Sequence, residues 1–380
     1  MKQIAILGST GSIGVNALRV IDEHPKEFKV AVLAARRNTE LLFEQAKKYR
    51  PKLVCLFENE TVFELERKLK PLHIRVVTGE SGLIEASTFR GADQVIFSIV
   101  GAVGLKPMLA AVSAGKRVAI ANKEPLVMAG GLLMAEAKKS GATVLPIDSE
   151  HSGLWQCLQG RDAKTVRKLI LTASGGPFFG KKVDFRKVTK QKALEHPKWK
   201  MGPKITIDSA TMMNKGLEVI EAAHLFGVSP DRIEVLIHPE AMIHAMIEFV
   251  DGAQLAQLGI PDMRLPIQYA MSYPERLQNL LPSLDLANTG PFHFYKPDLK
   301  KFPCLRLGYE AIRKGGTMPI VLNAANEVAV QWFLNERISF DVIPKIIEGV
   351  MAKHRCVAHS SLDEILCIDH WAREKAEALC

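Results

Sequence analysis

The sequence lacks paired cysteines, long apolar runs and low-complexity segments. Its six cysteines form no CxxC pair, so we expect neither a zinc site nor disulfides, only reduced thiols. No apolar run reaches the ~18–20 residues of a membrane span, and a strand-like run begins at Ile4, leaving no room for a signal or transit peptide. A cytoplasmic protein without a membrane partner is therefore expected. The cysteines are Cys55, Cys157, Cys304, Cys356, Cys367 and Cys380.

Motifs for nucleic-acid binding are also absent. The sequence has no zinc-finger spacing, no RNA-binding aromatic motif and no sustained basic helix, so we expect no nucleic-acid partner despite the formal charge of +9. The positive excess fits either a solvated surface or the attraction of a phosphorylated substrate. With 380 residues, 47% of them hydrophobic, the chain can form two or three domains with a sizeable core.

Residues 4 to about 147 alternate short apolar runs with helix-like stretches such as Ile13–Glu23 and Asn38–Tyr49. This alternation predicts a Rossmann-like α/β domain over residues 1–148, a parallel sheet with helices on both faces. Ligands of such sheets bind beyond the carboxyl ends of the strands. The predicted strands are Ile4–Leu7, Val30–Ala34, Leu53–Leu56, Val76–Thr78, Val95–Ser98, Arg117–Ile120 and Thr143–Ile147.

The rest of the chain changes character twice. Residues 149–283 mix strands and helices and carry most polar motifs, which predicts an α+β catalytic domain. Prolines mark residues 284–304 as a connector, and helical spacing of apolar residues predicts a helical domain over residues 305–380. The predicted strands of the catalytic domain are Lys168–Thr172, Ile205–Ile207, Arg232–Ile237 and Ala245–Phe249.

A glycine-rich turn, Gly8–Gly14, follows the first predicted strand and opens a helix. Its glycines allow close approach of a pyrophosphate, and the free N–H groups at the helix start can hold the anion. A glycine-rich turn without a ligand is the alternative. The second strand ends at Arg36 and Arg37 without an acidic residue, which favours NADP over NAD unless these arginines only form an exposed basic turn.

Two carboxylates, Asp148 and Glu150, directly follow the apolar run Thr143–Ile147. In an extended segment, side chains two residues apart point to the same face, so the two carboxylates would converge. Together with Glu218 they form an all-oxygen set, which favours Mg²⁺ or Mn²⁺ over zinc. His151 could coordinate the metal, transfer protons or orient a partner, although a lone histidine is more often structural.

Neutral donors and one cation form a candidate phosphate cradle. Ser174-Gly175-Gly176 follows a strand, and Ser209, Asn214 and Lys215 surround a second turn. The alternative for any single Ser or Asn is a helix cap. The segment His196–Gly202, part of a candidate flap over residues 196–204, contains Pro, Gly and Trp199 and suits a mobile lid, the alternative being a surface loop with a partly buried Trp.

These motifs together resemble the 1-deoxy-D-xylulose 5-phosphate reductoisomerase family over essentially the whole chain. The matching segments are Gly8–Gly14, Asn122–Glu124, Asp148–His151, Ser174–Gly176, His196–Gly202, Asp208–Thr211, Asn214–Glu218, Pro261–Arg264 and Asn323–Glu327. The resemblance implies an NADP-dependent oxidoreductase of non-mevalonate isoprenoid biosynthesis that works as a homodimer. It would use NADPH and Mg²⁺ or Mn²⁺, with Co²⁺ as a further alternative, to form 2-C-methyl-D-erythritol 4-phosphate.

The resemblance also implies roles for individual residues. Glu150, Lys123 and His151 would be catalytic, with Glu150 and Lys123 moving protons. The metal ligands would be Asp148, Glu150 and Glu218. The substrate contacts would be Lys123, Ser149, Glu150, Ser174, His196, Trp199, Ser209, Asn214, Lys215, Glu218 and His244. The cofactor contacts would be Gly8, Thr10, Gly11, Ser12, Ile13, Gly14, Asn122, Glu124, Met201 and Gly202, to which the basic turn after the second strand adds Arg36, Arg37 and Asn38.

Two departures from the family pattern stand out. Arg36 replaces a usual Gly and would either strengthen the hold on the 2′-phosphate of NADPH or crowd that pocket. Glu240-Ala241 replaces a usual Gln-Ser pair close to His244.

Two rival functions remain open. A semialdehyde dehydrogenase shares a similar turn but needs a cysteine nucleophile, for which Cys157 is the candidate. A non-enzymatic NADP sensor would bind the cofactor without consuming it.

Overall fold

The computed structural model describes residues 1–58, 60–199, 201–358 and 361–379. They divide into two compact units, each described here by itself. The first unit contains Met1–Pro125, Gly131–Ser152 and Asp262–Pro282. The second unit contains Leu126–Gly130, Gly153–Pro261 and Ser283–Cys380. Among the residues just listed, no helix is both long enough and apolar enough to cross a membrane.

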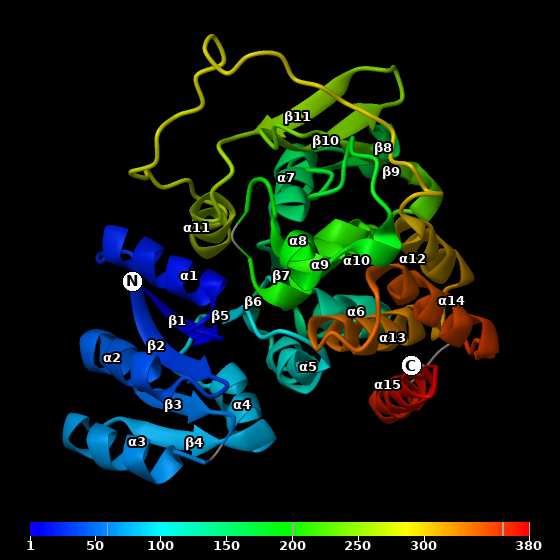
Figure 1. Ribbon diagram of the computed structural model, residues 1–380. Helices are drawn as coiled ribbons and strands as arrows, with labels where there is room; N and C mark the ends of the chain where they lie inside the picture. The colour runs from blue at the N-terminus through cyan, green and yellow to red at the C-terminus, as the bar shows by residue number, and fades with distance from the viewer. Residues whose placement is uncertain (59, 200, 359–360, 380) are drawn as a thin grey trace. The chain divides into compact units, whose positions relative to one another are not determined.

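The first unit is built on a seven-stranded parallel sheet with the order β4-β3-β2-β1-β5-β6-β7 (Figure 1), which confirms the predicted strands. The order reverses beside β1, and ligands bind such sheets at the carboxyl ends near this point. The strands are β1 Lys2–Leu7, β2 Phe28–Ala35, β3 Leu53–Leu56, β4 Arg75–Thr78, β5 Gln94–Phe97, β6 Arg117–Ile120 and β7 Thr143–Pro146. The helices are α1 Ser12–Glu23, α2 Thr39–Tyr49, α3 Val62–Leu69, α4 Gly79–Thr88, α5 Leu105–Ser113 and α6 Lys123–Ser140, of which Leu126–Gly130 belongs to the second unit.

A helix distant in sequence completes the first unit. Helix α11, Arg264–Ser272, packs against α1. The Lys2 ammonium donates to the carbonyl of Met271 at 2.9 Å, and Gln94 Nε2 donates to the carbonyl of Ala270 at 2.8 Å. Local periodicity could not predict that α11 packs on the first unit, because this packing depends on contacts between residues far apart in the chain.

The second unit contains a mixed sheet with the order β11-β10-β8-β9. Side chains alternate between its faces: Leu169 and Leu171 of β8 enter the main core, while Ile170 lies on the opposite face beside Met246. The strands are β8 Val166–Ala173, β9 Ile233–Ile237, β10 Ile243–Phe249 and β11 Gln254–Leu258. The edge strand β11 was not predicted, because its glutamines weaken the apolar pattern of a strand.

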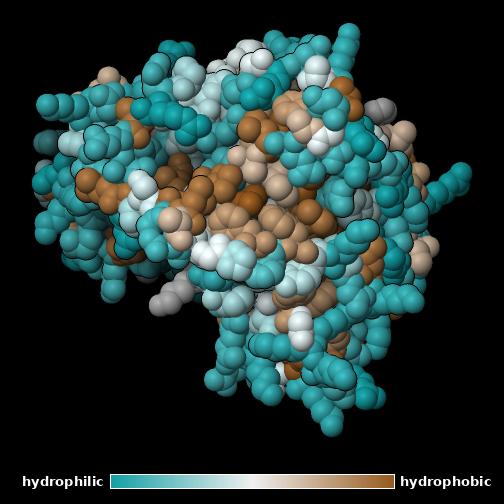
Figure 2. Space-filling model, turned by 90° about the horizontal axis from the view of Figure 1, so that it is seen from above, coloured by the Kyte–Doolittle hydropathy of each residue, from teal (hydrophilic) through white to brown (hydrophobic). Residues whose placement is uncertain are grey.

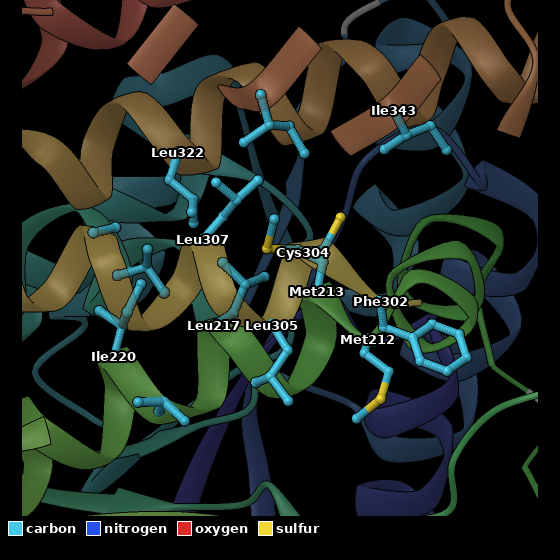
Figure 3. Close-up of a cluster of buried hydrophobic side chains, with 14 of the residues drawn as sticks. Met212, Met213, Leu217, Ile220, Phe302, Cys304, Leu305, Leu307, Leu322 and Ile343 are labelled. Carbon is cyan, nitrogen blue, oxygen red and sulfur yellow. The ribbon is translucent and has the colours of Figure 1, made fainter. Parts of the chain in front are cut away.

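Helices supply most of the core of the second unit. Figure 3 shows Leu217 of α10 among Leu305 and Leu307 of α12 and Leu322 of α13, and all four side chains are buried. These helices confirm the predicted helical C-terminal region. The remaining bounds are α7 Ser149–Leu158, which spans the boundary between the units, α8 Lys190–Leu194, α9 Pro203–Thr211, α10 Met213–Phe226, α12 Pro303–Lys314, α13 Met318–Leu334, α14 Ile343–Lys353 and α15 Leu362–Glu377.

The predicted strand Ile205–Ile207 is wrong, because these residues lie within α9. Pro203 at the first helical turn is preorganised for a helix, and Ile207 and Ala210 are both buried in the core. The β-branched run Ile205-Thr206-Ile207 indicates a strand by propensity alone, but packing of the helix against the core outweighs that weak preference.

Candidate active site

The glycine turn after β1 is closed tightly by its own backbone. Gly8 adopts φ 99°, and the N–H of Gly11 donates to its carbonyl at 3.0 Å. A Cβ at Gly14 would lie 2.3 Å from the carbonyl oxygen of Gly8, so only glycine fits there. Helix α1 begins at Ser12, and its N-cap Gly11 has no side chain to cap the first N–H groups, which suits them to an anion. Thr10 and Ile13 belong to the same turn.

The end of β2 presents the predicted 2′-phosphate residues. The Arg36 guanidinium is 77% exposed and donates from Nε to Glu58 Oε1 at 2.6 Å. The side chain of Asn38 caps α2 by accepting from the N–H of Leu41 at 3.1 Å. Glu58, which the sequence did not single out, is therefore a partner that orients Arg36.

Buried polar residues follow β6 in the first unit. Asn122 precedes the first turn of α6, and its Nδ2 donates to the carboxylate of Glu124. Both side chains and that of Lys123 are buried. Gly104 makes room for this arrangement, since a Cβ there would lie 2.2 Å from Asn122 Oδ1. A polar cluster fixed this firmly can present the same groups to a ligand each time it binds.

The carboxylate corner after β7 differs from the extended segment predicted for it. Helix α7 begins at Ser149, so Glu150 lies in its first turn and convergence by strand alternation is wrong. The Lys123 ammonium forms an ion pair with Asp148, and His151 Nδ1 lies 3.3 Å from the same carboxylate oxygen. Ser149 Oγ donates to Glu150 Oε2 at 2.6 Å. Glu150 and Lys123, the two groups predicted to move protons, are thus held by Ser149 and Asp148 respectively.

In the second unit, the first turn of α10 joins predicted phosphate residues to a predicted metal ligand. Asn214 Nδ2 donates to Glu218 Oε1, and Lys215 Nζ donates to Glu218 Oε2, both at 2.5 Å. Glu218 is completely buried and Lys215 is nearly so. A buried carboxylate is tolerated only with such partners, so these three side chains form one preorganised group.

Ser174 and Ser209 are brought together by a close backbone contact. Gly176, two residues after Ser174, has φ 66°, and a Cβ on it would lie 2.8 Å from the carbonyl oxygen of Ser209. The turn after β8 therefore packs directly on α9. Two separate segments of the predicted phosphate cradle meet here.

His196, at the start of the predicted flap, is bonded to Ser174. Its Nδ1 accepts the N–H groups of Lys198 and Trp199 at 3.2 and 2.9 Å, so its Nε2 carries the proton and donates to Ser174 Oγ at 3.0 Å. Burial lowers the pKa of His196 to about 4, which keeps the ring neutral. Because Ser174 Oγ accepts this bond, its own hydroxyl proton can be donated to an anion.

A cavity of about 760 Å³ opens beside Ser174 and His196. Its walls carry both signs of charge, and the sequence did not single out Lys181, Lys198 or Glu195 as part of it. The lining residues are Ser174, Gly176, Pro177, Phe179, Lys181, Glu195, His196, Pro197, Lys198, Pro239 and Glu240. This is space for an anionic ligand group next to the hydroxyl of Ser174.

The other predicted residues of the second unit occupy distinct places. Trp199 and Met201 are half-buried, and Gly202 immediately precedes α9. His244 is buried on β10, where its carbonyl accepts from Thr172 Oγ1 at 2.7 Å. Lys200, inside the predicted flap, lies outside the described residues.

Cys157 does not have the properties of a nucleophile. Its side chain is buried in the core of the second unit, and burial raises its pKa to about 11. A thioester-forming cysteine needs access and a lowered pKa, so this observation disfavours the semialdehyde dehydrogenase alternative.

Comparison with known proteins shows the family of the chain. The family model described as 1-deoxy-D-xylulose 5-phosphate reductoisomerase matches residues 4–130, the C-terminal domain model of the same enzyme matches residues 144–226, and the DXP reductoisomerase C-terminal domain matches residues 258–375. The chain belongs to the 1-deoxy-D-xylulose 5-phosphate reductoisomerase family.

Individual relatives cover nearly the whole chain. The reductoisomerase of Thermodesulfovibrio yellowstonii is 50% identical over 99% of both chains, and that of Heliobacterium modesticaldum is 52% identical over 99% of this chain and 97% of its own. A structure of the family in complex with NADPH, fosmidomycin and magnesium matches with a TM-score of 0.95 and 41% identity. The Zymomonas mobilis enzyme in complex with NADPH matches with a TM-score of 0.93 and 41% identity. Each of these two matches covers 100% of this chain and 98% of the other.

Proposed function

We propose that the chain catalyses the conversion of 1-deoxy-D-xylulose 5-phosphate to 2-C-methyl-D-erythritol 4-phosphate, with NADPH as reductant and a divalent metal as cofactor. The observation that carries this proposal is family membership over the full chain, with 50% identity to a named reductoisomerase. The reaction belongs to non-mevalonate isoprenoid precursor biosynthesis. Related structures in complex with NADPH and with magnesium support both cofactors.

The residues present suit a hard cation. Asp148, Glu150 and Glu218 would supply the oxygen ligands that Mg²⁺ or Mn²⁺ prefers, and Co²⁺ is a further candidate. When bound, the cation supplies Lewis-acid stabilisation of negative charge on substrate oxygens. Lys123 pairs with Asp148, so an ammonium lies beside one of the proposed ligand carboxylates.

We assign the proton transfers to Glu150 and Lys123, and a supporting catalytic role to His151. The rearrangement of the carbon skeleton requires a proton to leave one substrate hydroxyl and another to be returned to an oxygen. Glu150, fixed by Ser149, can accept a proton, and the Lys123 ammonium can donate one. His151 contacts Asp148 and is better placed to orient that carboxylate than to exchange protons itself.

The substrate would be held at its phosphate end by hydrogen-bond donors of the second unit. Ser174, Ser209, Asn214 and Lys215 supply hydroxyl, amide and ammonium donors. Lys123, Ser149 and Glu150 would contact the polar carbon backbone, and His244 completes the site. His196 and Trp199 would close over the substrate and exclude water before hydride transfer. Glu218 would contribute as a metal ligand in contact with substrate.

NADPH would bind the glycine turn through its pyrophosphate. The contacts assigned to it are Gly8, Thr10, Gly11, Ser12, Ile13, Gly14, Arg36, Arg37, Asn38, Asn122, Glu124, Met201 and Gly202. In this assignment Arg36 and Arg37 face the 2′-phosphate. Met201 and Gly202 would adjoin the nicotinamide, from which hydride passes to the aldehyde formed by the rearrangement.

The three-domain organisation, the homodimer and the cytoplasmic location belong to the proposal as well. We assign residues 1–148 to NADPH binding, 149–283 to catalysis, 284–304 to a connector and 305–380 to a helical domain. Self-association rests on the resemblance to the family. Figure 2 shows some hydrophobic side chains on the face that it draws. On the second sheet, Ile170, Ile243 and Met246 form a buried cluster against which Leu236, Ala256 and Phe292 pack. Free thiols at the five described cysteines suit a reducing compartment.

The direct test is NADPH oxidation by the purified chain. Oxidation that requires both 1-deoxy-D-xylulose 5-phosphate and Mg²⁺ or Mn²⁺, and that is much slower with NADH, is the expected result. Equal rates with the metal present or chelated would contradict the proposal. Cofactor binding without turnover would favour the NADP-sensor alternative. Full activity of Cys157→Ala would eliminate the dehydrogenase alternative.

A further inference from the structure

Glu240, an acidic residue, lines the cavity that Ser174 also lines. A sphere of 760 Å³ is about 11 Å across, close to the Debye length of ~10 Å at 0.1 M salt, so charges on its walls act on a ligand inside it. If the substrate phosphate binds at Ser174, as the proposed function holds, a bare carboxylate here would repel it. Binding of the phosphate therefore requires that other groups offset the negative charge of Glu240.

The connector supplies partners for both oxygens of this carboxylate. Glu240 Oε1 lies 2.7 Å from His293 Nδ1, and Oε2 accepts the backbone N–H of His293 at 3.2 Å. His238 Nδ1 lies 3.0 Å from Oε2 as well. Burial acts to raise the pKa of Glu240, but the hydrogen bonds from His293 and the nearby His238 outweigh it and lower the pKa, so the group is ionised.

His293 is held in place by its neighbours. Tyr295 and Ile237 exchange two backbone hydrogen bonds of 2.8 and 2.9 Å, which attach the connector to the end of β9. Phe294 stacks on the His238 ring with 4.8 Å between centroids. His238 accepts the N–H groups of Met242 and Ile243 at Nε2, so its Nδ1 carries the proton. The ring of His293 is thus fixed to the turn that carries Glu240.

We propose that His293 is a specificity-determining residue: it binds the Glu240 carboxylate and prevents that negative charge from opposing the phosphate end of the substrate. The connector then acts as an electrostatic part of the substrate pocket. The ligand affected is anionic and phosphorylated, because repulsion by Glu240 would weaken the binding of such a ligand and not that of a neutral one.

The test is a double-mutant comparison of steady-state KM and kcat. His293→Ala leaves Glu240 without the imidazole and is expected to raise KM for 1-deoxy-D-xylulose 5-phosphate by roughly three- to tenfold, with kcat within twofold. Glu240→Gln should remain near the starting KM. The double variant His293→Ala/Glu240→Gln should recover most of the KM lost by His293→Ala, and 0.5 M salt should shrink the defect of His293→Ala.

A merely structural role for His293 gives a different pattern. The double variant would then be at least as impaired as His293→Ala, and salt would not correct it; this result would overturn the inference. His293→Gln, which keeps a donor, should show a smaller KM defect than His293→Ala and serves if the alanine variant is unstable. The matched control is His370→Ala, which breaks an exposed His–Glu pair with Glu374 on α15 and should not change KM.

Ser174→Ala separates failure of this inference from failure of the proposed function. An unchanged KM for Ser174→Ala would show that the phosphate does not bind there, and the inference would fall with that assignment. A raised KM for Ser174→Ala with an unchanged KM for His293→Ala would overturn the inference alone.

Discussion

The glycine turn of the first unit and the Ser174 pocket of the second unit hold their proposed anions by different means. The turn uses backbone N–H groups, and glycines spaced three residues apart create its shape: a Cβ on Gly14 would meet the carbonyl oxygen of Gly8 at 2.3 Å. The pocket uses side chains from separate segments, held by the contact of Gly176 with Ser209 and the bond between His196 and Ser174. Substitution of a glycine in the turn should therefore abolish most anion binding there. Substitution of one side chain in the Ser174 pocket should only weaken anion binding, because other donors remain.

Glu150→Gln should have the largest effect, because it removes the proposed proton acceptor from the corner after β7. We expect kcat to fall by about 10³-fold, while the dissociation constant of NADPH changes less than about threefold. Stopped-flow fluorescence of NADPH binding and steady-state assays measure the two quantities. Comparable losses in both would indicate that Glu150 is structural.

Gly14→Ala tests the backbone site. The added Cβ would meet the Gly8 carbonyl at 2.3 Å and distort the turn, so we expect NADPH affinity to fall on the order of 100-fold. The matched control is Gly131→Ala in α6, where a Cβ would contact nothing within 4 Å. That variant should keep its affinity and gain roughly 0.5–1 kcal/mol in stability. Normal NADPH binding by Gly14→Ala would refute this role for the turn.

His196→Ala tests the side-chain site, since it removes the ring that bonds to Ser174. KM for the substrate should rise about tenfold, because the variant loses one hydrogen bond that positions the Ser174 hydroxyl. NADPH affinity should change little. His196→Gln, which can still donate to Ser174, should recover part of the loss. Equal defects in the two variants would mean that ring packing, and not the bond, positions Ser174.

The protonation of His196 should also distinguish this site from an exposed loop. Its folded-state pKa of about 4 lies below the ordinary 6.5, so between these pH values the unfolded chain binds more protons. Its contribution to stability is fully present above about pH 6.5 and is lost as the pH falls toward 4. An NMR titration, with His196→Gln to assign the signal, should find a neutral ring at pH 6; a midpoint near 6.5 would contradict the buried bond.

Arg36→Gly should have the smallest effect. The guanidinium is mostly exposed and bonded to Glu58, so its loss should change KM for NADPH by about two- to threefold. A rise in KM would mean that Arg36 helps hold the 2′-phosphate, and a fall would mean that it crowds the pocket. Measuring NADH in parallel shows whether the 2′-phosphate is the group concerned.

The sequence predicted the first unit well because its signals are local. The alternation of strands and helices and the Gly8–Gly14 turn are contiguous, and parallel strands bury both faces, which makes the apolar runs easy to recognise. The extended geometry predicted after β7 was wrong, because helix α7 begins at Ser149. The apolar run that precedes Ser149 gives no signal of this helix start.

The second unit was harder to predict because its contacts join distant segments. The resemblance identified Ser174, Ser209 and Lys215, but only the structure shows Gly176 against Ser209 and Lys215 against Glu218. The binding of Glu240 by His293 spans 53 residues and lies in what the prolines indicated was only a connector. No local pattern encodes such a pair.

The most direct measurement of the central claim is transfer of deuterium from [4,4-²H₂]NADPH, in which both hydrogens at C4 are labelled. With 1-deoxy-D-xylulose 5-phosphate and Mg²⁺, mass spectrometry and NMR should find 2-C-methyl-D-erythritol 4-phosphate carrying one deuterium on the carbon derived from the intermediate aldehyde, and none should form after chelation of the metal. Oxidation of the labelled cofactor without deuterium in this product, or formation of an unrearranged reduced sugar phosphate, would contradict the account.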